Sequence, residues 1–122
     1  MNNYCKIYFT TQEILSIIEN NIRPFLNLNE NQIDLNKNMD FDKTKQSEFP
    51  DGFLFFRYTL DFEPDNLEKS ECIILINKLL DWFWDHNIPA VASCDYENEL
   101  VNKGGYNNSG LPFPHPRNIA KT

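Results

Sequence analysis

The sequence predicts an α+β fold in which two helices cover one face of a four-stranded antiparallel sheet. Four segments alternate apolar with polar residues or are rich in β-branched and aromatic side chains, as strands are. Two others repeat apolar residues at helical spacing. The order is strand, helix, strand, strand, helix, strand, which is that of the ferredoxin-like βαββαβ arrangement. With 122 residues the chain has room for one such domain, expected over residues 1–106.

The first strand and helix are expected within residues 4–23. Residues 4–9 alternate and are mostly aromatic or β-branched, which predicts a strand. Thr10 and Glu13 fit a capping box that would start the helix. Pro24 is expected to end that helix, because the residue before a proline is driven out of the α region. The apolar positions of the helix are Ile14, Leu15, Ile17, Ile18 and Ile22.

The second and third strands are expected on either side of a turn at residues 50–52. Pro50 fixes φ there and Gly52 would supply a positive φ. Residues 53–63 show the strongest alternation in the chain and predict the third strand. The second strand is expected at a sheet edge because its intervening residues are polar. Its alternating apolar positions are Ile33, Leu35, Met39 and Phe41.

The second helix is expected to begin after Asn66 or Ser70 and to run to about Asn87. Trp82 and Trp84 lie about 200° apart around it, so both cannot face one core. The fourth strand is expected over residues 90–96. Residues 107–122, rich in Gly, Asn and Pro, predict an irregular and mobile tail.

Composition narrows the classes of partner. The formal net charge of −7 argues against nucleic-acid binding, which depends on Lys and Arg meeting phosphates. No run of about 20 apolar residues is present, so no membrane span is expected. Cys5, Cys72 and Cys94 have no metal-binding spacing and are expected to be buried thiols of a cytoplasmic protein.

Five carboxylates are the candidate partner-binding groups. Asp95, Glu97 and Glu99 alternate directly after the expected fourth strand, and in extended backbone they would project from one face. Such a row repels itself unless it meets a cation, a basic protein surface or water. Asp61 and Glu63 would join the row if the third and fourth strands end on the same side of the sheet.

Three other kinds of site are alternatives to an acidic partner-binding surface. A Mg²⁺ or Ca²⁺ site needs clustered oxygen ligands, but the acid spacing matches no calcium loop. RNA stacking on the open sheet face lacks its usual strand motif, and Asp61 and Glu63 would repel phosphate. Cys94 could pair with His86 or His115 as nucleophile and base only if the fold brings them together. No catalytic residue, metal or cofactor is therefore expected.

The chain resembles immunity proteins of bacterial polymorphic toxin systems, among them contact-dependent growth inhibition systems. The residues that carry the resemblance are 53–58, 94–100 and 104–106. It implies a non-enzymatic cytoplasmic protein that binds a cognate toxin, often a basic nuclease, and occludes its active site. An aromatic anchor such as Tyr96 or Tyr106, or one of the tryptophans, would supply the hot spot.

Two alternatives to the inhibitor function stay open at this point. One is a small metal- or ligand-binding domain, or an enzyme, on the same scaffold. The other is a homo-oligomeric subunit that assembles through the open face of its sheet.

Overall fold

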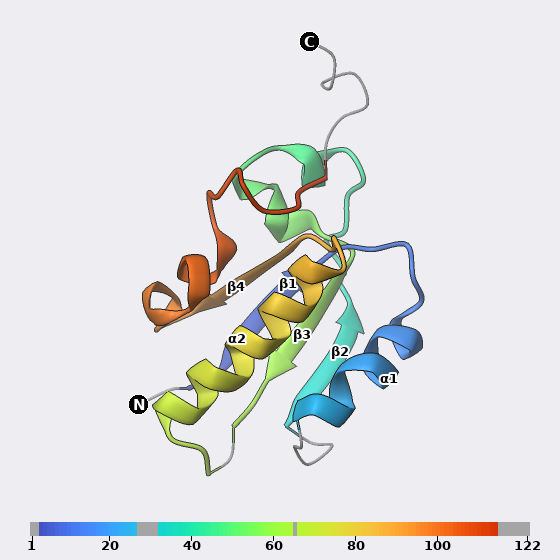
Figure 1. Cartoon of the computed structure of the whole chain (residues 1–122). Coiled ribbons are helices and arrows are strands. Elements are labelled where there is room, and N and C mark those ends of the chain that lie inside the picture. Colours follow the sequence, from blue (N-terminus) through green and yellow to red (C-terminus); the bar gives the residue numbers. More distant parts are fainter. Residues whose placement is uncertain (1–2, 27–31, 65, 115–122) are drawn as a thin grey trace.

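The computed structural model describes residues 3–26, 32–64 and 66–114 (Figure 1). The two long helices are α1 (Leu15–Leu26) and α2 (Lys69–Asp85). The strands are β1 (Cys5–Phe9), β2 (Ile33–Lys37), β3 (Tyr58–Phe62) and β4 (Ala90–Cys94). Four short 3-10 helices complete the structure: η1 (Lys45–Ser47), η2 (Asp51–Phe55), η3 (Glu97–Glu99) and η4 (Val101–Gly105).

The four strands form one antiparallel sheet in the order β2-β3-β1-β4. The central strand β1 pairs with both β3 and β4, so that Cys5 lies opposite Phe62 on one side and Cys94 on the other. Because β3 also pairs antiparallel with β2, strands β1 and β2 run in the same direction. The α+β class, the four-stranded antiparallel sheet and the edge position of β2 are confirmed.

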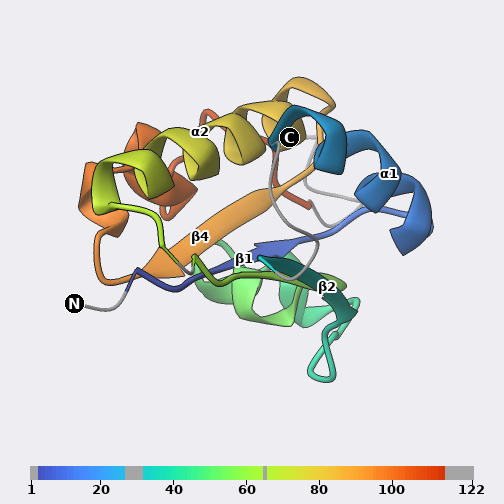
Figure 2. The same ribbon diagram turned by 90° about the horizontal axis from the view of Figure 1, so that it is seen from below.

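The main core lies between the sheet and the two helices, which cover the same face (Figure 2). From β1 this face receives Cys5, Ile7 and Phe9, each 0% exposed. The α2 helix contributes Ile76 and Phe83, and the Phe83 ring stacks on Phe9 with centroids 4.6 Å apart. Fully burying a large apolar side chain contributes about 1.5–3 kcal/mol, so this layer supplies most of the stabilisation.

The opposite face of the sheet is partly covered by the segment that contains η1 and η2 (Figure 2). Phe53 packs edge-on against Tyr8 of β1, with ring centroids 5.3 Å apart. Thr59 of β3 is buried beneath the same layer. The chain itself therefore partly covers Tyr8, one of the aromatic side chains that a bare sheet face would offer for base stacking.

The expected start and end of the first helix are wrong. Thr10 is buried at the end of β1, where its hydroxyl donates to Gln46 Oε1 at 2.8 Å and cannot cap a helix. Pro24 lies inside α1, which continues to Leu26. An ion pair between Arg23 and Glu19 holds the last turns together, with Arg23 Nε 2.6 Å from Glu19 Oε2.

Two of the five apolar positions expected on the inner face of α1 are exposed. Ile18 and Ile22 are buried, whereas Ile14 and Ile17 are 59% and 43% exposed. Ile14 precedes the helix, and both residues lie outside the stripe that faces the sheet.

The expected third strand is too long, because residues 51–55 form η2 and only Tyr58–Phe62 form β3. Phe53 packs downward onto Tyr8, and Phe56 packs against Phe113 with ring centroids 5.7 Å apart. The apolar alternation of residues 53–57 therefore reflects a second layer of packing, not strand pairing.

The other strand and helix boundaries differ by smaller amounts. The second strand ends at Lys37, and Met39 is 94% exposed, so the expected extension to Phe41 is wrong. The second helix begins at Lys69 after a capping box between Glu68 and Glu71. Both tryptophans are half-buried, and Trp84 Nε1 donates to the Ala90 carbonyl at 3.1 Å.

Residues 107–114 form turns without a helix or strand, and residues 115–122 lie outside the described part of the chain. Phe113 anchors the described portion by packing edge-on against Phe49, with ring centroids 5.1 Å apart. Within the described residues, no helix is both long and apolar enough to cross a membrane.

Gly52 is required for space and not for a positive φ, which it does not adopt. A Cβ at this position would lie 2.6 Å from the Gln46 carbonyl oxygen and 2.7 Å from that of Lys45. We expect Gly52→Ala to destabilise the fold by about 1–3 kcal/mol through this overpacking. Thermal unfolding should show the loss as a Tm lower by several degrees.

The matched control is Gly110→Ala, where the added methyl group would meet the movable Asn108 side chain at 3.3 Å. Its Tm should stay close to that of the wild type. An equal Tm for the two variants would show that the η1–η2 packing tolerates a side chain at Gly52.

Candidate functional site

Strands β3 and β4 end at the same end of the sheet, on either side of the start of β1. Cys5 is paired with Phe62 and Cys94, so Glu63 and Asp95 each follow directly beyond these pairs. Two strand spacings, about 10 Å, separate the positions that they occupy. We call this region the acidic end; it comprises Asp61, Glu63, Glu68, Glu71, Asp95, Glu97 and Glu99. The start of α2 joins it because Lys69 Nζ lies 2.8 Å from Glu99 Oε2.

The row of three alternating carboxylates at residues 95–99 does not exist. The fourth strand stops at Cys94, a turn follows, and Glu97–Glu99 form η3. Glu97 Oε1 accepts a hydrogen bond from the Cys94 N–H at 3.2 Å, while Glu99 pairs with Lys69. Asp95 is exposed. The three acids therefore share one end of the molecule but not one face.

Burial of Tyr96 explains why the strand ends early. Its ring is 4% exposed, and its hydroxyl donates to the Asn3 carbonyl at 2.7 Å. Burial, with the neighbouring cysteine thiols, raises the pKa of Tyr96 well above its usual range. Drawing this ring into the core turns the backbone away from β1. Tyr96 is thus a core residue and offers no accessible surface to a partner.

Asp61 lies on the sheet face opposite the helices, in register with Asp34 on one side and Lys6 on the other. Its carboxylate accepts a hydrogen bond from the Tyr4 hydroxyl. Burial, then this bond, and then the charges of Asp61 and Glu63 raise the pKa of Tyr4 far above its ordinary value. The phenol therefore stays protonated and remains the donor in its hydrogen bond with Asp61.

Tyr106 and Glu97 line one hollow of about 220 Å³ beside β4, on the sheet face opposite the helices. Tyr106 is 42% exposed, and its hydroxyl donates to Asp51 Oδ1 at 2.7 Å. We call this feature the acidic hollow. Carboxylates of Asp51 and Glu97 lie on its rim, and its apolar walls come from Phe53, Leu54, Val91 and Ala92.

Sequence reasoning missed Asp51 and the apolar walls of this hollow. In the sequence, Asp51 is part of a predicted turn, and no pattern connects it to Glu97, which lies far along the chain. The structure brings together Glu97 and Tyr106 in the hollow and Glu63 and Asp95 at the strand ends. It separates Tyr96 from all of them by burial.

The fold does not bring Cys94 and His86 together. His86 caps the end of α2, beside the start of β4, and its Nδ1 lies 2.7 Å from the Trp82 carbonyl oxygen. Cys94 is at the other end of that strand. His115 lies outside the described residues. Within the part of the chain that the structure describes, no three His, Cys, Asp or Glu side chains are grouped to hold a metal ion.

Comparisons with known proteins add no relative. No protein-family model, no curated protein and no solved structure matches this chain. What the protein does must therefore be argued from its own surface.

Cys5 and Cys94 lie directly opposite each other on β1 and β4. The interaction between these two thiols raises the pKa of the buried Cys5 and lowers that of Cys94. Cys94 is only half-buried, whereas Cys72 is buried and its pKa is raised by burial. The more ionised and more accessible of the three thiols is therefore Cys94.

We expect limited alkylation of the native protein with iodoacetamide to modify Cys94 first, because the thiolate is the nucleophile. Peptide mass spectrometry after short exposure identifies the modified thiol. The Cys94→Ser variant should lose the fast phase and Cys72→Ala should keep it. A fast phase at Cys5 or Cys72 would contradict the assignment.

Proposed function

We propose that this protein is an inhibitor of immunity type, which binds a basic protein toxin through the acidic hollow and blocks it. The observation that carries the proposal is a cavity with two carboxylates at its rim and apolar walls. Such a cavity fits a Lys or Arg side chain, which buries an aliphatic stem and carries a charged head.

The hollow can hold such a side chain without rearranging its carboxylates. Asp51 Oδ1 is held by the Tyr106 hydroxyl, and Glu97 Oε1 by the Cys94 N–H. Among the described residues, no hydrogen bond or ion pair engages the second oxygen of either carboxylate, which leaves it for an incoming cation. Preorganised acceptors of this kind reduce the entropy lost on binding.

The acidic end would add long-range attraction next to this contact. It holds seven of the eighteen acidic residues of the chain, while the formal net charge is −7. Complementary charge mainly speeds association and selects partners, whereas buried contacts slow dissociation. A basic nuclease cleft, built to hold a polyanion, has the complementary charge.

We also propose that the fold is of the ferredoxin-like type and that the protein acts in the cytoplasm without a catalytic step. The strand order β2-β3-β1-β4, with β3 between the parallel β1 and β2, supports the first part. The three described cysteines are free thiols, as is usual where thiols stay reduced.

The test removes the charge of the hollow without changing its shape. The double variant Asp51→Asn/Glu97→Gln keeps both hydrogen-bond acceptors and lowers the net negative charge by two. We expect its affinity for the partner to fall at least tenfold, about 1.4 kcal/mol or more. The matched control is Asp40→Asn/Glu13→Gln, which makes the same charge change at exposed positions outside the hollow.

The partner is first captured from a lysate of the native host with the wild-type protein as bait. Each bait variant is then titrated against the purified partner by surface plasmon resonance. Expression of the partner alone should arrest bacterial growth, and co-expression with the wild type should restore it. An acidic or harmless partner, or equal weakening by both double variants, would refute the proposal.

A further inference from the structure

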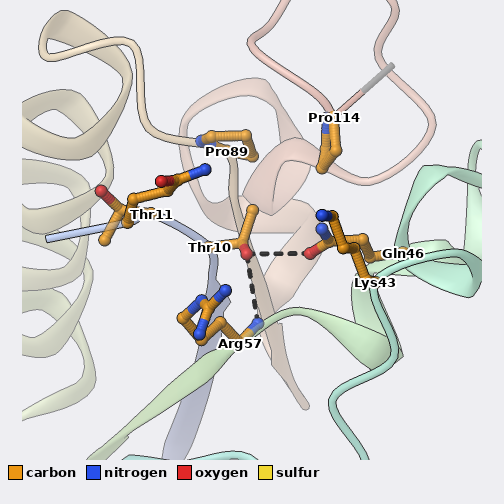
Figure 3. A pocket seen from close by; sticks show the side chains of 8 residues that line it. Thr10, Thr11, Lys43, Gln46, Arg57, Pro89 and Pro114 are labelled. Atoms are coloured by element: carbon orange, nitrogen blue, oxygen red, sulfur yellow. Dashed lines mark hydrogen bonds between the residues drawn. The ribbon is translucent and has the colours of Figure 1, made fainter. Parts of the chain in front are cut away.

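A second hollow, also of about 220 Å³, lies at the opposite end of the sheet from the acidic end. It is where β1 ends, β3 begins and the chain enters β4 (Figure 3). The polar lining comes from Thr10, Thr11, Gln12, Lys43, Gln46 and Arg57. Pro89 and Pro114 form apolar parts of its wall.

The charge of this hollow is opposite to that of the molecule. Two cationic side chains, Lys43 and Arg57, line it and no carboxylate does, in a chain with 18 acidic and 11 basic residues. The guanidinium of Arg57 lies 4.4 Å from the centroid of the Phe41 ring. Among the described residues, neither cation has an ion pair.

Hydrogen bonds inside the hollow fix donors and consume acceptors. The Thr10 hydroxyl donates to Gln46 Oε1 at 2.8 Å and accepts from the backbone N–H of Arg57 at 3.3 Å (Figure 3). Thr10 is itself buried. With Oε1 used in this way, the Gln46 side chain keeps its Nε2 amide donor for another group. The lining therefore holds two cations and a free amide donor, and no carboxylate to balance their charge.

The acidic residues nearest in sequence do not supply a carboxylate to the lining of the hollow. Asp42 precedes Lys43, but its Oδ1 accepts from the N–H groups of Thr44 and Lys45, both at 2.9 Å. Glu13 follows Gln12 and does not line the hollow. The described residues that line the hollow therefore offer no negative charge to Lys43 and Arg57.

We propose that this hollow binds the oxyanion group, phosphate or carboxylate, of a small molecule. Arg57 presents a planar fork suited to two such oxygens, and Lys43 adds a mobile positive charge. The hollow has a volume of about 220 Å³. That is below the usual range for drug-sized ligands, so the ligand is an anion of few atoms beyond its charged group.

The test titrates the full protein with inorganic phosphate and, separately, with citrate, at constant ionic strength set with chloride. Amide chemical shifts in ¹⁵N-labelled protein report the position and the affinity of binding. We expect saturable one-to-one binding of at least one probe, with the largest shifts around Thr10, Gln46 and Arg57. The probe that saturates identifies the class of oxyanion.

Lys43→Gln removes one exposed cation without touching the core, and we expect it to weaken binding at least fivefold. The matched control is Lys78→Gln, which removes an exposed cation from α2 and should leave the affinity unchanged. Arg57→Lys keeps the charge but loses the fork, and should also weaken binding. Amide chemical shifts that change linearly with the concentration of both probes, without saturation, would overturn the proposal. Equal weakening of anion binding by Lys43→Gln and Lys78→Gln would also overturn it.

The anion-binding proposal is independent of the inhibitor proposal. The Asp51→Asn/Glu97→Gln variant changes only the acidic hollow, beside β4 on the sheet face opposite the helices, and should bind the anion as the wild type does. Loss of anion binding in that variant would show that the two hollows are not separate sites. It would also count against the anion-binding proposal.

Discussion

The pairing of β1 with strands on both sides is the constraint on which the rest of the structure depends. This strand is buried on its helix-facing side at Cys5, Ile7 and Phe9, and its backbone hydrogen bonds hold β3 and β4 in register. The acidic end and the hollow lined by Lys43 and Arg57 lie at its two ends. Tyr4 precedes the strand and donates to Asp61 at the acidic end. Thr10 follows the strand and donates to Gln46 in the second hollow, which we call the cationic hollow because Lys43 and Arg57 line it.

The molecule is consequently charged in opposite senses at the two ends of its sheet. Four rises along a five-residue strand span only about 14 Å. Over this distance the surface changes from clustered carboxylates to a hollow lined by Lys43 and Arg57. The basic partner proposed above would bind at the acidic hollow beside β4, and the proposed anion would bind beside Lys43 and Arg57, so the two ligands do not compete for the same charged groups.

Much of this fold could be predicted from the sequence, because periodicity reports the layer next to the helices well. Positions 5, 7 and 9 alternate and are buried as that pattern indicates. The errors arise where a second packing layer competes. Phe53 and Phe56 belong to a run of apolar residues that predicts a strand, but they pack against Tyr8 and Phe113. Likewise, the acids of residues 95–99 alternate in sequence, but burial of Tyr96 bends the backbone beneath them.

The candidate sites were less accessible to such reasoning, because each joins segments that are distant along the chain. Asp51 meets Tyr106, and Gln46 meets Thr10, through contacts that no local pattern encodes. Net charge indicated an acidic surface, but it concealed the cationic hollow, since eleven basic residues among eighteen acidic ones carry no positional information.

The turn at residues 101–105 has a consequence for self-association. Gly104 and Gly105 approach the outer strand so closely that a Cβ on either would lie 3.0 Å from the carbonyl oxygen of Ala92 or Ala90. The turn therefore covers the edge strand β4, where another chain could otherwise add a strand to the sheet. The other margin, β2, carries Asp34, Asn36 and Lys37, the kind of polar and charged side chains with which natural proteins discourage fibrillar stacking.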